Sequence, residues 1–226
     1  MKINHRLKVL GDLVPDNSTC LDIGCDHAFL DIYLEQSNRG IKAIASDIKE
    51  GPLEQAKQNI RREKLEGKIE VRLGNGLDTY TKDINTIIIS GMGGRNIIGI
   101  FKNNMKYLKN IETIILSPNN YQIDVKKFLC KNGFYIDDEE FVKDKKFIYQ
   151  IIIFKKGKKS YTKRQYFFGP IFLIKKGELF KEYYERECKT REIMLEFLPK
   201  RFYLRRKKIQ KEITEIKNEL KIQKTK

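Results

Sequence analysis

The sequence predicts an α/β fold in which helices cover both faces of a doubly wound, mostly parallel sheet, followed by a basic helical region. Three observations predict it. Short β-branched runs recur between residues 19 and 154 and alternate with helix-like stretches. Several of these runs carry apolar residues on both faces, as do strands buried in a parallel sheet. Beyond residue 155 the pattern changes to basic segments with helical periodicity.

Seven segments are expected to form strands. In chain order they are TCLDIG (19–24), IKAIASD (41–47), IEVRLGN (69–75), NTIIISG (85–91), ETIILSP (112–118), FYIDDEEFVKD (134–144) and FIYQIIIF (147–154). Helix-like stretches lie between them at 28–36, 51–63, 96–108 and 121–131. Pro52 suits a first helical turn, and Gly133 suits a helix end. The last two strands leave no room for a helix between them, so we expect an antiparallel pair at the sheet edge.

The region after the last strand is basic. KKGKKSYTKRQ, near residues 155–165, lacks a periodic apolar face and predicts a linker or basic loop. Helices are expected at 177–197 and 199–223. The second carries an apolar stripe at spacings of 7, 4, 3 and 4, formed by Phe202, Ile209, Ile213, Ile216 and Leu220. This stripe predicts an antiparallel, coiled-coil-like helix pair. We therefore expect two domains, residues 1–156 and residues 157–226.

The positive charge is concentrated in this last region. Residues 155–226 hold 23 Lys and Arg against nine Glu, whereas residues 1–154 hold 23 against 21 acidic residues. A genome biased toward Lys codons would act on the whole chain, so the asymmetry predicts a polyanionic partner. Nucleic acid is favoured over a membrane surface because no helix pairs this charge with an exposed aromatic face.

Other classes of protein are disfavoured. No apolar run is long enough to span a membrane, and no leader-like apolar segment follows the first residues, so we expect a cytoplasmic protein without a membrane partner. The four cysteines form no C-x-x-C pair, and there are two histidines. We therefore expect free thiols and no metal site.

Ligands of such sheets bind at the carboxyl ends of the strands, near the point where the strand order reverses. Glycine or short polar residues follow every parallel strand. The candidate cofactor-binding residues are Asp22, Gly24, Asp26, His27, Asp47, Ile48, Asn75, Gly76, Gly91 and Gly93.

The chemistry of these residues indicates a ligand with a ribose and a cationic tail. Asp47 ends the second strand, where an acidic residue binds ribose hydroxyls. A pyrophosphate needs free backbone N–H groups, and Asp26 and His27 stand where further glycines would serve it, which argues against NAD. S-adenosylmethionine fits, with its ribose at Asp47 and its ammonium and sulfonium near Asp22 and Asp26.

Structural alternatives exist for the same residues. Asp22 could cap a turn, Asp26 could be the N-cap of the next helix, and His27 could be a helix residue without a ligand. NGLD (75–78) could be a plain turn. GMGG (91–94) implies close backbone approach, either to a ligand or to another segment of the chain.

The chain resembles the bacterial tRNA (adenine-22-N1)-methyltransferases. The matching pieces are RLKVLGDLVP (6–15), LDIGCDHAFL (21–30), EGPLEQAK (50–57), GNGLD (74–78), ISGMGG (89–94), SPNN (117–120) and FFGPIF (167–172). The resemblance implies a Rossmann-like class I methyltransferase domain and a C-terminal helical domain that helps to hold tRNA. The chain departs from the family pattern at four positions. The family usually has Ser, Pro, Glu and Gln where this chain has Cys25, Asp31, Asp47 and Ser117, respectively.

The resemblance implies methyl transfer from S-adenosylmethionine to N1 of adenine 22 in tRNA. We expect Asp26 to stabilise the positive charge on the methylated base. By analogy with the Asn/Asp-Pro-Pro slot of other N-methyltransferases, Asn119 would hydrogen-bond the adenine edge. A paired adenine hides N1, so the base must be unpaired or extruded. The residues expected to grip phosphates are Lys158, Lys159, Lys163, Arg164, Arg201, Arg205, Arg206, Lys207 and Lys208.

We expect the enzyme to be a monomer. Two alternatives from other classes stay open at this point. One is a nicotinamide-dependent oxidoreductase on the same sheet topology, which the missing glycines after Gly24 disfavour. The other is a non-catalytic RNA-binding protein with a relic of the cofactor fold, which would leave Asp22, Asp47 and Asn119 without purpose.

Overall fold

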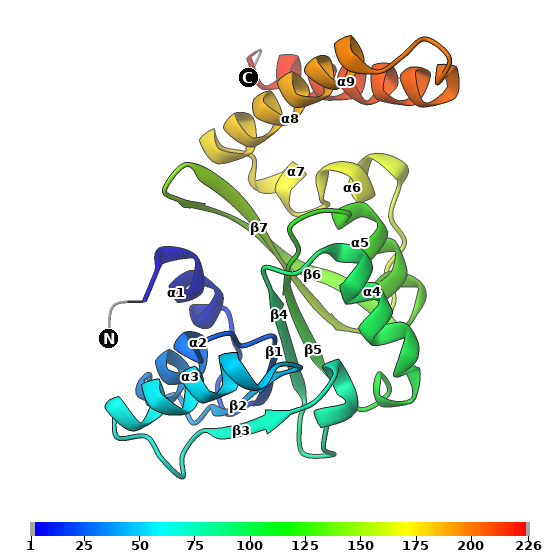
Figure 1. Cartoon of the computed structure of the whole chain (residues 1–226). Helices are drawn as coiled ribbons and strands as arrows, with labels where there is room; N and C mark the ends of the chain where they lie inside the picture. The colour runs from blue at the N-terminus through cyan, green and yellow to red at the C-terminus, as the bar shows by residue number, and fades with distance from the viewer. Residues whose placement is uncertain (1–2, 225–226) are drawn as a thin grey trace. The chain divides into compact units, whose positions relative to one another are not determined.

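The computed structural model describes residues 3–224 (Figure 1). The chain divides into two compact units, with the boundary between Ile174 and Lys175. The first unit contains the sheet, and the second is a helical hairpin. This division does not test the predicted boundary between two functional domains at residues 156 and 157, which stays a prediction.

The sheet has seven strands in the order β3-β2-β1-β4-β5-β7-β6. The strands are β1 (Thr19–Ile23), β2 (Lys42–Asp47), β3 (Glu70–Leu73), β4 (Thr86–Ser90), β5 (Thr113–Ser117), β6 (Phe134–Asp144) and β7 (Phe147–Lys156). The first five are parallel, and β7 runs antiparallel to both β5 and β6. All seven expected strands and the antiparallel edge pair are confirmed. The strand order reverses between β1 and β4, which places the ligand-binding edge there.

Helices cover both faces of the sheet, as a doubly wound fold requires. They are α1 (His5–Asp12), α2 (Phe29–Gln36), α3 (Glu50–Arg62), α4 (Gly94–Asn103) and α5 (Gln122–Lys131), with short 3₁₀ turns η1 (Gly76–Thr79) and η2 (Met105–Tyr107). Ile87 and Ile89 pack on the face covered by α4 and α5, whereas Ile88 packs on the face covered by α1 and α2. Successive side chains of a strand point to opposite faces, so the uniform apolar character of β4 follows from burial on both.

The expected linker near residues 155–165 is partly wrong. Strand β7 continues to Lys156, and α6 (Lys163–Phe168) begins soon after it, which leaves only residues 157–162 irregular. Thr162 and Gln165 form a capping box: the Thr162 hydroxyl accepts from the Gln165 N–H at 3.2 Å, and the Gln165 side chain accepts from the Thr162 N–H at 2.8 Å. This T-x-x-Q signal overrides the absence of an apolar period.

A buried ion pair attaches the segment after α6 to the sheet. Lys126 Nζ of α5 lies 2.6 Å from Glu139 Oε1 of β6, and both side chains are buried. The other Glu139 oxygen accepts from the backbone N–H of Ile171, at 2.9 Å, and of Phe172, which begins α7 (Phe172–Lys175). Gly169 has φ +93°, and a Cβ there would collide with the Glu139 carboxylate. The FFGPIF piece therefore has a packing role in the first unit.

The second unit is a hairpin of α8 (Glu178–Phe197) and α9 (Tyr203–Lys224). Ile209, Ile213 and Ile216 are buried, which confirms that part of the apolar stripe. Phe202 precedes α9 and is exposed, so the helix begins later than expected and Phe202 is not part of the stripe. Polar links join the helices, including Arg191 Nε to Glu212 Oε2 at 2.9 Å.

Candidate functional site

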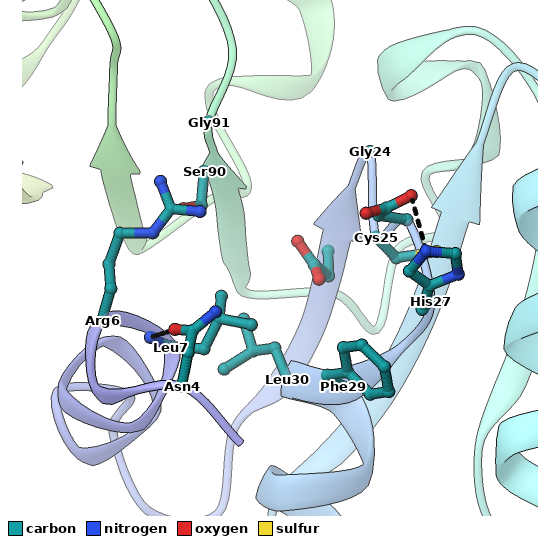
Figure 2. A pocket seen from close by; sticks show the side chains of 12 residues that line it. Asn4, Arg6, Leu7, Gly24, Cys25, His27, Phe29, Leu30, Ser90 and Gly91 are labelled. Atoms are coloured by element: carbon teal, nitrogen blue, oxygen red, sulfur yellow. Dashed lines mark hydrogen bonds and ion pairs between the residues drawn. The ribbon is translucent and has the colours of Figure 1, made fainter. Parts of the chain in front are cut away.

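A cavity of about 460 Å³ lies at the carboxyl ends of β1 and β4, where the strand order reverses (Figure 2). This volume is within the range of small-molecule sites. Residues from β1, the turn after it, α2, the end of β4 and the start of α1 line the cavity. They are Asn4, Arg6, Leu7, Asp22, Gly24, Cys25, Asp26, His27, Phe29, Leu30, Ser90 and Gly91.

The turn between β1 and α2 has an unusual backbone. Gly24, Asp26 and Ala28 all have positive φ, at 78°, 53° and 57°. Left-handed non-glycine residues cost free energy and cluster at functional sites. The N-cap of α2 is Ala28, without a side-chain cap, so the alternative that Asp26 caps this helix is wrong. Asp26 is instead exposed, with its Oδ1 3.6 Å from His27 Nε2.

Asp22 places a carboxyl group in the lining of this cavity. It is buried, and its pKa is raised well above the ordinary value by burial and by the nearby carboxyls of Asp31 and Asp47. Within residues 3–224, no Lys, Arg or His side chain forms an ion pair with it. A buried carboxylate is costly unless a cation pairs with it, so the cavity favours a cationic ligand.

Asp31, where the resemblance implies a Pro in the family, is a second buried acid beside this site. It lies in the first turn of α2 and is fully buried. Burial raises the pKa of Asp31 to about 7. Neither carboxyl oxygen has a hydrogen-bond partner among the described residues. Sequence reasoning noted the departure from the family at this position but did not predict its burial.

The predicted ribose site continues along the same edge of the sheet, outside the cavity lining. Asp47 at the end of β2 is half-buried, and its Oδ1 accepts from the Lys49 N–H at 2.9 Å. The exposed Ile48 follows it. Strand β3 pairs with β2, and Asn75 and Gly76 come after it at the start of η1. NGLD therefore forms a 3₁₀ turn at this edge.

The GMGG and SPNN loops are tied to each other. The Asn119 side-chain amide donates to the Gly91 carbonyl, and the Asn119 N–H donates to the Met92 carbonyl at 3.0 Å. The Gly94 N–H donates to Asn120 Oδ1 at 3.1 Å. The close backbone approach implied by the glycines is thus, at Gly94, an approach to another chain segment. Gly93 is the N-cap of α4 and does not line the cavity, whereas Gly91 does.

Sequence reasoning missed the contribution of α1. Arg6 is the one Lys or Arg in the cavity lining, and its guanidinium lies 4.4 Å from the centre of the Tyr149 ring. The Asn4 side chain caps α1 by accepting from the Leu7 N–H at 2.9 Å. The Asn4 cap before an apolar-periodic stretch was the available signal for this helix. Its packing beside α2 on one face of the sheet was not readable from sequence.

The predicted RNA-binding residues fall into two groups. Four of them belong to the first unit: Lys158 and Lys159 follow β7, and Lys163 and Arg164 begin α6. The other five, Arg201, Arg205, Arg206, Lys207 and Lys208, belong to the second unit. Arg206 donates to the carbonyl oxygens of Leu195, at 2.6 Å, and of Leu198, so it closes the end of the hairpin.

In residues 3–224 no three His, Cys, Asp or Glu side chains gather in a way that could hold a metal ion. Nor does this part of the chain include a helix that is long and apolar enough to cross a bilayer.

Comparison with known proteins agrees with this geometry. The model of a family described as tRNA (adenine(22)-N(1))-methyltransferase matches residues 20–225. The Bacillus subtilis protein of the same description is 30% identical over 158 residues, which are 70% of this chain and 66% of that protein. A putative tRNA methyltransferase of Mycoplasma genitalium is 30% identical over 175 residues, which are 74% of this chain and 78% of that protein.

Solved structures match over almost the whole chain. Sp1610 of Streptococcus pneumoniae, in complex with S-adenosyl-L-methionine, is 32% identical with a TM-score of 0.89, covering 97% of this chain and 100% of that one. TrmK of M. capricolum, in complex with S-adenosyl-homocysteine, is 26% identical with a TM-score of 0.85, covering 98% and 99%. The predicted Rossmann-like methyltransferase fold, enzyme class and cofactor are thereby confirmed, and the nicotinamide alternative is set aside. This chain belongs to the tRNA (adenine(22)-N(1))-methyltransferase family.

Proposed function

We propose that this chain methylates N1 of adenine 22 in tRNA and that the cavity at the ends of β1 and β4 holds the cationic tail of the methyl donor. The observation that carries this proposal is the buried Asp22 carboxyl, which no cation of the described chain neutralises. Arg6 faces the same cavity and would pair with the carboxylate of the amino-acid tail. A zwitterionic tail therefore matches both charges of the cavity lining.

The remaining contacts of the cofactor would follow the sheet edge. The Asp47 carboxylate would accept from the ribose hydroxyls, and the exposed Ile48 side chain would cover one face of the adenine ring. Asn75 and Gly76 at the start of η1 would border that ring. S-adenosylmethionine, when bound, supplies a methyl group that its sulfonium activates, so the protein mainly positions the acceptor.

The acceptor base would lie against the linked GMGG and SPNN loops. The amide nitrogen of Asn119 donates to Gly91, so the amide oxygen is the atom that would accept from the exocyclic amine of adenine. The Asp26 carboxylate is exposed beside the cavity and would stabilise the positive charge that N1 acquires. Because the adenine must be unpaired to reach this site, we propose a base-extrusion or base-opening step.

Methyl transfer to tRNA transcripts tests the proposal. The protein is incubated with methyl-labelled S-adenosylmethionine and unmodified tRNA, and the modified nucleotide is mapped. The expected product is N1-methyladenine at position 22, and a transcript with guanine at this position serves as the matched control. Binding of both ligands without label transfer would instead support the relic RNA-binding protein. Label at another nucleotide would contradict the assigned position.

The same proposal covers partner and location. The family's substrate is tRNA, so we propose tRNA as the macromolecular partner and the cytoplasm as the place of action. The monomeric state stays a prediction, which light scattering of the purified protein would test.

A further inference from the structure

The turn between α8 and α9 carries an apolar surface that the cofactor site does not explain. We define the hairpin tip as residues 193–208. Its large side chains are exposed: Phe197 by 81%, Leu204 by 80% and Tyr203 by 65%. Ile193 and Met194 are also exposed, and together with Phe197 they line a groove of about 390 Å³ on α8. An apolar patch of this kind on a solvent-facing helix end marks an interaction site.

The charge of the hairpin tip restricts the partner. Residues 193–208 contain six Lys or Arg and a single acidic residue, Glu196. Arg206 is engaged with the α8 carbonyls, and the other five cations are exposed around the aromatic rings. The Arg201 guanidinium lies 5.2 Å from the centre of the Phe202 ring. A second copy of this cationic tip would be repelled, whereas a polyanion would be attracted.

The exposed aromatic rings of the tip are not explained by phosphate binding. Cations alone would suffice to hold a double-stranded RNA backbone. Exposed rings among those cations suit single-stranded nucleic acid, because every base offers a face for stacking. The expectation that no helix of this chain joins its charge to an exposed aromatic face is wrong at this tip. The rings and cations alone would also suit a lipid bilayer. We favour nucleic acid as the partner of the tip because the family acts on tRNA.

We propose that the hairpin tip binds unpaired bases of tRNA by stacking them on Phe197 and Tyr203, while the surrounding Lys and Arg contact adjacent phosphates. The proposal rests on the proposed function, which supplies tRNA as the partner. Helix α8 has 20 residues, so the tip lies about 30 Å along α8 from the start of that helix. The tip thus forms a second tRNA contact, separate within the chain from the residues that hold the cofactor.

A single tryptophan at the tip reports the contact directly, because the chain contains no Trp. In Tyr203→Trp, stacking with a base is expected to quench the fluorescence when unmodified tRNA is added. Phe147→Trp, at an exposed aromatic position at the start of β7, is the matched control and should change little. Quenching by tRNA supports the proposal. No quenching, or equal quenching of the control, overturns it.

The same fluorophore distinguishes the other occupants. A blue shift with anionic lipid vesicles but no response to tRNA would assign the tip to a membrane surface. A blue shift that grows with protein concentration, without any ligand, would assign it to a second copy. Either result would overturn the proposal.

Binding measurements give an independent test. The double variant Phe197→Ala, Tyr203→Ala should raise the Kd for tRNA about 5- to 100-fold. The slope of log Kd against log salt should stay the same, because no charge is removed. Phe197→Trp, which keeps a stacking surface, should retain wild-type affinity. Unchanged affinity of the double variant would overturn the stacking role.

Failure here is distinguishable from failure of the proposed function. If the wild-type protein methylates tRNA and the tip variants bind tRNA as tightly, the stacking proposal alone is wrong. If the wild-type protein transfers no methyl group to any tRNA, the proposed function is wrong.

Discussion

Both the cavity of the first unit and the hairpin tip of the second carry charged side chains. Those of the cavity are mainly acidic and partly buried, whereas those of the tip are basic and mostly exposed to solvent. Asp22 in the cavity lining and Asp31 beside it are buried carboxyls, and burial raises the pKa of both. The tip exposes five of its six cations, beside exposed rings. Buried charges respond to protonation and are little screened, whereas exposed charges are screened by salt. We therefore expect pH to control the first site and salt to control the second.

The largest expected effect is on stability through Asp31. Between about pH 4 and pH 7 the folded chain holds a proton that an unfolded Asp has released, because the pKa of buried Asp31 is raised to about 7. The free energy of unfolding therefore falls as pH rises through this window, by about 1.4 kcal/mol per pH unit for each such proton. Asp31→Asn should flatten this slope and be more stable than wild type at pH 8. Urea unfolding at several pH values measures it.

Asp124→Asn, at an exposed position of α5, is the control for this series and should keep the wild-type slope. An Asp31→Asn variant with the wild-type slope would show that Asp31 is not the group that holds the proton.

The next largest effect is expected for Asp22→Asn. Loss of a buried charge that pairs with the cationic tail should raise the Kd for S-adenosylmethionine about 100-fold. The affinity for tRNA should change little, because the tip and the other basic residues are untouched. Isothermal titration with each ligand separates the two. A parallel loss of tRNA affinity would remove the distinction between the two sites.

A smaller effect is expected for two neighbouring arginines of α9, one of which should affect stability and the other tRNA binding. Arg206→Ala removes the hydrogen bonds to the Leu195 and Leu198 carbonyls and should lower the free energy of unfolding by about 2 kcal/mol. Arg205→Ala should leave stability within about 0.5 kcal/mol and reduce the salt slope of tRNA binding by about one. Thermal unfolding and salt-dependent binding give both readouts. Equal stability losses would contradict the assigned roles.

The smallest effect is expected at Asp47. Asp47→Glu keeps the carboxylate and introduces the residue that the resemblance implies for the family, so the Kd for S-adenosylmethionine should change less than about threefold. Asp47→Ala should raise that Kd about tenfold. Titration of both variants compares them. Equal losses in the two variants would show that the contact depends on the length of the side chain rather than on its charge.

The sequence predicted much of the fold because the strands carry their own signal. Uniformly apolar β-branched runs are typical of strands buried on both faces, and the parallel order follows from the helices between them. Half of the candidate cofactor residues meet in the cavity for the same reason: the carboxyl ends of β1 and β4 lie side by side. The missed elements have short or local signals. Helix α6 depends on one capping box, and α1 on an Asn4 cap.

The site contains features that no local pattern predicts. Arg6 lines the cavity because α1 packs with α2 on one face of the sheet. Asp31 is buried with its α2 neighbours Leu30 and Ile32. Arg206 is indistinguishable from Arg205 in sequence, yet its guanidinium closes the hairpin. Each role depends on contacts with residues from other elements.

By itself the sequence determined the sheet, the polar ends of its strands, the family and the concentration of positive charge after residue 155, since periodicity, residue type and charge are properties of the chain itself. Only the tertiary structure decided which acidic side chains are buried and which arginine forms hydrogen bonds within the hairpin. It also decided that aromatic rings are exposed among the cations of the hairpin tip. The physical reason is solvation. The pKa of a carboxyl group and the availability of a ring for stacking depend on what surrounds them in three dimensions.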